Sequence, residues 1–149
     1  MTIRQGAPAF SAALFVVVAA ACSPGGSVAT QLRSWQSGAS YAQSQQQLKS
    51  DLEDIVTGLR TGPLAAVRTA CDGFGVDAAN AYGQLPTPDH FLTERLNGEY
   101  IDFENAAEAC SSAPSLHAKA ITRFLNLAVQ GKGELAAAKR RIGEILGAA

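Results

Sequence analysis

The chain has 149 residues, of which 47% are hydrophobic and 17% are charged, with 12 Lys and Arg against 13 Asp and Glu. This length accommodates one compact domain after an export segment and is short for two typical domains. Arg4 is the only base before Cys22, so 11 bases face 13 acids in the rest of the chain. This slightly negative balance argues against a nucleic-acid partner.

The first 21 residues have the layout of an export signal. Arg4 is followed by an apolar run from Phe10 to Ala21, which only Ser11 interrupts. A membrane-spanning helix needs roughly 20 apolar residues, and this run is shorter. We therefore expect residues 1–21 to be removed as a signal peptide.

Small residues before Cys22, and the segment from Ser23 to Gly26 after it, resemble a bacterial lipobox. The resemblance implies that Cys22 carries a lipid that anchors the protein in the cell membrane, on its extracytoplasmic face. Ala19, where Leu is usual, also suits an ordinary signal peptidase, which would give a secreted protein. Three cysteines leave one unpaired in an oxidising compartment unless Cys22 is modified. Residues 22–34 are small and polar and predict a flexible tether.

Residues 35–149 predict an all-α domain. Apolar residues recur at steps of three and four and indicate helices over about 34–60, 63–85, 88–110 and 114–146. Thr87 is a suitable N-cap for the third of these helices. The expected fold is an up-down bundle of about four helices with one disulfide, between Cys71 and Cys110.

The disulfide constrains the connection between the second and third helices. At 1.5 Å per residue, Cys71 to Leu85 spans roughly 21 Å and Pro88 to Cys110 roughly 33 Å. A tight hairpin would therefore separate the two sulfurs, whereas a disulfide needs Cα atoms within about 7 Å. We expect the chain from Leu85 to about Phe91 to run back along the bundle in an extended form.

A family resemblance covers the segment from Trp35 to Cys110. Cys71 in an Ala-rich helix, the Leu85-Pro86-x-Pro88-Asp89 connector, the segment from Ala106 to Cys110 and the start at Trp35 are together similar to small exported helical proteins of actinobacteria, many of them lipid-anchored. The resemblance implies the helical fold and the disulfide, and it carries no activity.

No set of residues specifies a reaction, a metal or a cofactor. His90 and His117 are the only histidines, and neither has the spacing that places metal ligands on one helix face. The sequence contains neither a G-x-S-x-G nucleophile motif nor a glycine-rich phosphate-binding loop. The acidic residues of the third predicted helix are expected on its exposed face, with no pair placed as acid and base: Glu94, Glu99, Asp102, Glu104 and Glu108. We therefore expect a protein without catalytic, cofactor-binding or metal-binding residues.

The function that these observations favour is a lipid-anchored, non-enzymatic module that binds another envelope protein. Acidic residues concentrate in 51–108 and basic residues in 119–141, and pairing between the two blocks is expected. Ala and Gly are abundant on the apolar stripes, so the bundle either packs closely or leaves an apolar cavity. A carrier or sensor of a small apolar ligand in the bundle interior is therefore the alternative function.

Overall fold

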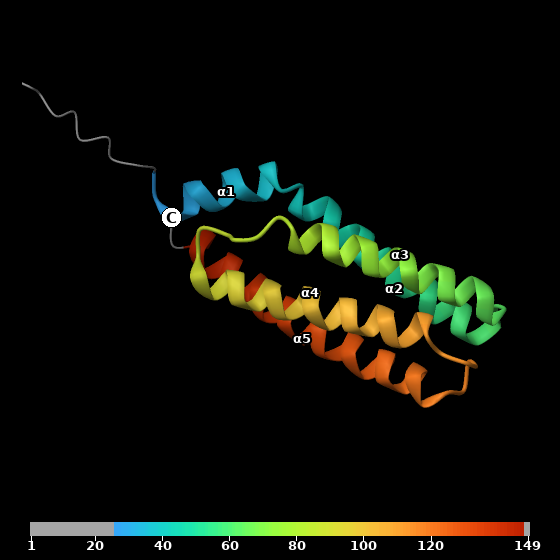
Figure 1. Ribbon diagram of the computed structural model, residues 1–149. Helices are drawn as coiled ribbons and strands as arrows, with labels where there is room; N and C mark the ends of the chain where they lie inside the picture. Colours follow the sequence, from blue (N-terminus) through green and yellow to red (C-terminus); the bar gives the residue numbers. More distant parts are fainter. Residues whose placement is uncertain (1–25, 148–149) are drawn as a thin grey trace, which may run out of the picture.

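Five α-helices account for most of the chain in the computed structural model, which describes residues 26–147 (Figure 1). No strand occurs among these residues. The helices are α1 (Val28–Gly38), α2 (Tyr41–Thr61), α3 (Leu64–Tyr82), α4 (His90–Ser111) and α5 (Lys119–Gly147). The all-α prediction is confirmed, whereas the predicted number of helices, four, is wrong.

The additional helix arises because the segment predicted as one helix over 34–60 is broken. Ser40 adopts a left-handed conformation, with φ 50° and ψ 35°, which interrupts the helix between α1 and α2. Trp35 lies on α1, before this break, and its indole Nε1 donates a hydrogen bond to the Gln84 carbonyl oxygen at 3.0 Å. The spacing of apolar residues does not reveal the break at Ser40, because residues on both sides of this break are buried.

The segment 22–34, predicted as a flexible tether, is helical from Val28 onward. The Ser27 hydroxyl caps α1 by accepting a hydrogen bond from the Thr30 N–H. Leu32 is fully buried and Ala29 nearly so. The cap and this apolar burial explain why the segment folds, and the bundle domain therefore begins before Trp35. The predicted signal peptide and Cys22 lie outside the described residues.

Helices α2 to α5 run in alternating directions, and each packs against the next along the chain (Figure 1). The central helix is α4, which contacts both α3 and α5. Its Phe103 packs against Phe74 of α3, with ring centroids 5.1 Å apart. On the other side Gly131 of α5 lies so close that an added Cβ would be 2.5 Å from Phe103 Cε1. Glycine therefore permits the close approach of α5 to α4.

The disulfide between Cys71 and Cys110 joins α3 to α4, with Cα atoms 5.9 Å apart. The residues from Leu85 to Asp89 are not helical, and they run along the bundle before α4 starts (Figure 1). This connection makes up the difference between the two helix lengths, so the expected path is confirmed.

The N-cap of α4 is Asp89 rather than Thr87. The Asp89 carboxylate accepts a hydrogen bond from the Leu92 N–H at 2.8 Å. Thr87 instead donates its hydroxyl to the Asp89 carbonyl oxygen at 2.7 Å. Asp89 also pairs with Arg141 of α5 at 2.7 Å, which is one instance of the expected pairing between the acidic and basic blocks.

Candidate functional site

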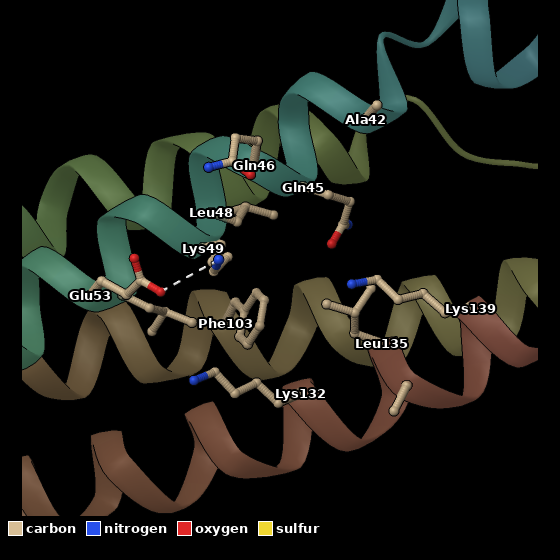
Figure 2. Close-up of a pocket in the computed structure, with 12 residues that line it drawn as sticks. Ala42, Gln45, Gln46, Leu48, Lys49, Glu53, Phe103, Lys132, Leu135 and Lys139 are labelled. Carbon is tan, nitrogen blue, oxygen red and sulfur yellow. Dashed lines mark ion pairs between the residues drawn. The ribbon is translucent and has the colours of Figure 1, made fainter.

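The bundle is not closed between α2 and α5. No Cα atoms of these two helices lie within 8 Å of each other, whereas all pairs of helices that follow one another from α2 to α5 approach this closely. A groove with a volume of about 480 Å³ lies between them (Figure 2). We call it the α2–α5 groove; its lining residues are Ala42, Gln45, Gln46, Leu48, Lys49, Leu52, Glu53, Phe103, Lys132, Leu135, Ala136 and Lys139.

The floor of the groove is apolar and fixed in place. Phe103 is 1% exposed and is held between α3 and α5, as described above. Leu48 and Leu52 come from α2, and Leu135 comes from α5. Leu48, Leu52 and Phe103 belong to the buried core, whereas Leu135 is only partly buried.

Charged side chains line the rim and are mainly basic. Lys132 and Lys139 are seven residues apart on α5, which places both on one helix face. Lys49 and Glu53 form an exposed ion pair on α2 at 3.7 Å. Three ammonium groups therefore surround the groove against the single rim carboxylate of Glu53. The rim favours an acidic or electron-rich occupant.

A buried polar cluster lies behind one end of the groove. Glu99 of α4 has no exposed surface. Gln45, which lines the groove, donates its amide Nε2 to Glu99 Oε2 at 3.4 Å and to the Tyr100 hydroxyl at 3.3 Å. Gln45 and Lys139 extend from opposite walls toward the same end of the groove (Figure 2). Gln45 thus connects the groove with the buried carboxyl group.

The buried cluster has an unusual protonation state. Burial raises the pKa of Glu99 to about 8, although the Gln45 amide and the Lys139 ammonium act in the opposite direction. Burial also raises the pKa of the Tyr41 and Tyr100 hydroxyls. At neutral pH most Glu99 carboxyls are therefore protonated, and the cluster adds little negative charge to the basic rim.

Several oxygen atoms of this cluster lack a hydrogen-bond partner among the described residues. These atoms are Glu99 Oε1, Gln45 Oε1 and the Tyr41 hydroxyl. A buried polar group without a partner costs roughly 1–3 kcal/mol. Buried oxygens of this kind are usually paired with bound water.

The residues singled out in the sequence lie away from the groove. Cys71 and Cys110 form the predicted bridge between α3 and α4. His90 is exposed and lies 3.2 Å from Glu94 in the next helical turn. His117 is exposed in the segment before α5. Within residues 26–147, no group of three or more His, Cys, Asp or Glu side chains is placed to hold a metal ion.

The prediction that Glu99 lies on an exposed acidic face is wrong. The sequence contained a signal for its burial, because Leu92, Leu96, Glu99 and Phe103 follow one another at steps of four, three and four. Tyr100, the next residue, is buried as well. The groove itself had no comparable signal, since it depends on the spacing between two helices that are not neighbours in the sequence.

The comparisons with known proteins add no relative. No protein-family model, no curated protein and no solved structure matches the chain. None of the helices in the described part of the chain combines the length and the apolar character that a membrane span requires.

Proposed function

We propose that the protein is a lipid-anchored, non-enzymatic module on the extracytoplasmic face of the cell membrane, which binds another envelope protein through the α2–α5 groove. The observation that carries this proposal is the open apolar groove between α2 and α5. An apolar groove between helices is the surface into which a partner helix commonly docks.

The construction of the groove supports a binding role. Leu48, Leu52 and Phe103 of its floor belong to the core, and the disulfide ties α4, which supplies Phe103, to α3. A surface that is already formed before binding loses little conformational entropy when a partner arrives. The anchor on Cys22 and the location outside the cytoplasmic membrane rest on the signal-like sequence before residue 23.

Site-specific photo-cross-linking in intact cells tests this proposal. A photoreactive amino acid at Ala42 or Ala136 would lie on the two walls of the groove. The same amino acid at Ala66, which is exposed on α3 outside the groove, is the matched control. We expect one protein to be cross-linked from both walls and not from Ala66. Cross-links that are absent, or equal at all three positions, would contradict the proposal.

The size of the groove favours a second candidate function, the carriage of a small apolar molecule. Ligand sites typically have volumes of about 300–1,000 Å³, and the groove falls in this range with about 480 Å³. The native intact mass of the protein, extracted from its envelope in mild detergent, separates the two candidates. An additional small-molecule mass would favour the carrier, and the same spectrum reports whether Cys22 carries a lipid.

A further inference from the structure

The face of α5 that lines the α2–α5 groove continues beyond the groove. Leu125, Val129, Lys132, Ala136 and Lys139 follow one another at steps of four, three, four and three, which places all five on one helix face. The last three line the groove. Leu125 and Val129, which are 42% and 69% exposed, therefore continue the same stripe toward the N-terminus of α5.

The opposite wall extends in the same direction. Ala42, Lys49 and Val56 are seven residues apart and share one face of α2. Because α2 and α5 run antiparallel, the Val56 end of α2 lies opposite the Val129 end of α5 (Figure 1). Val56 is half-buried. The two stripes together form a binding surface that is longer than the groove alone.

The length of this surface distinguishes between possible occupants. From Leu125 to Lys139 the α5 stripe spans roughly 21 Å, or about four helical turns. A small molecule that fills the groove would leave Leu125 and Val129 exposed to water. An α-helix of about four turns covers the whole stripe with residues at its own steps of three and four.

The charge of the surface indicates the charge that its occupant should carry. Lys49, Lys132 and Lys139 are opposed by Glu53 alone at the rim, and the carboxyl of Glu99 behind it is mostly neutral. Lys49 on the α2 wall and Lys132 and Lys139 on the α5 wall complement acidic residues at both flanks of a docked helix.

We propose that the occupant is an amphipathic helix of a partner protein, about four turns long, with an apolar stripe flanked by acidic residues. This inference rests on the proposed function and names the chemistry of the partner. Its apolar face packs on Leu135, Ala136 and Val129, and its acidic flanks pair with Lys132 and Lys139.

Two synthetic helical peptides of about 16 residues test the inference. Both carry the same leucine stripe, flanked by glutamates in one peptide and by lysines in the other. Binding to the full mature chain, with its disulfide intact, is measured by fluorescence anisotropy. We expect the glutamate peptide to bind roughly tenfold more tightly, since two or more exposed ion pairs replace repulsions.

Charge reversal on α5 locates the binding site. The double substitution Lys132→Glu with Lys139→Glu should abolish or invert the preference for the glutamate peptide. The double substitution Lys119→Glu with Arg123→Glu changes the net charge equally, outside the groove-lining residues, and should preserve the preference. Circular dichroism verifies that both variants fold.

The inference is overturned if neither peptide binds at about 100 µM, if both bind equally, or if the two double variants behave alike. These outcomes can be distinguished from a failure of the proposed function. A partner cross-linked at Ala42 and Ala136 would still establish the groove as a docking surface, and only the acidic helix would be refuted.

Discussion

Glu99→Gln changes the buried carboxyl into an amide of nearly the same size, which cannot ionise. The amide also retains an oxygen that can accept the hydrogen bond from Gln45. The substitution therefore isolates the contribution of one ionisable group to the pH dependence of stability. We expect the variant to be more stable than the parent protein at neutral and alkaline pH.

The magnitude follows from the shift in pKa. An unfolded chain loses the Glu99 proton near pH 4.5, whereas the folded protein retains it up to a pKa of about 8. Between these values the folded state binds more protons, so the free energy of unfolding falls as the pH rises. The loss amounts to about 3 kcal/mol at pH 7 and approaches about 5 kcal/mol above pH 9.

Urea denaturation from pH 5 to pH 9, followed by circular dichroism, measures this effect. The stability of Glu99→Gln relative to the parent should increase by about 2–3 kcal/mol between pH 5 and pH 7. Glu108 is exposed on the same helix, so Glu108→Gln serves as the control for the loss of one carboxylate. A difference that does not vary with pH would refute the reasoning, because Glu99 would then ionise normally in the folded protein.

Three further predictions concern the framework of the bundle. Gly131→Ala should destabilise the protein by about 1–3 kcal/mol because the new Cβ would overlap Phe103, whereas Gly133→Ala, which has open space, should be neutral or stabilising by up to about 1 kcal/mol in thermal unfolding. The Arg141 guanidinium holds the pKa of Asp89 below its usual range; Asp89→Asn should therefore cost about 1 kcal/mol at pH 7, and the cost in urea titrations should disappear as the pH falls through the lowered pKa. Removing the disulfide, whose half-cystines are 39 residues apart, should cost about 4 kcal/mol in denaturation compared with and without reductant.

Much of the helical framework could be predicted from the sequence because the helices bury regular stripes. Leu92, Leu96 and Phe103 repeat at helical spacing and are all nearly or fully buried. The disulfide and the unequal helix lengths also determined the extended connection after Leu85. Local spacing and chain length were sufficient for these features.

The features that escaped prediction depend on tertiary contacts. The break at Ser40 interrupts a stripe that continues on both sides, so periodicity does not reveal it. The burial of Glu99 conflicts with the usual exposure of carboxylates, although its heptad spacing was compatible with the core. The groove lies between α2 and α5, whose Cα atoms stay more than 8 Å apart, and no local sequence pattern predicts the distance between two helices that are not consecutive.

Helix α1 also determines where the proposed lipid anchor would attach to the domain. With the proposed anchor at Cys22, only five residues separate the lipid from Val28, and these span at most about 18 Å. Helix α1 contacts α5, and its N-terminal end lies beside the C-terminal end of α5 (Figure 1). The proposed lipid would therefore attach to the domain beside the C-terminal end of α5, at the opposite end of that helix from Lys119.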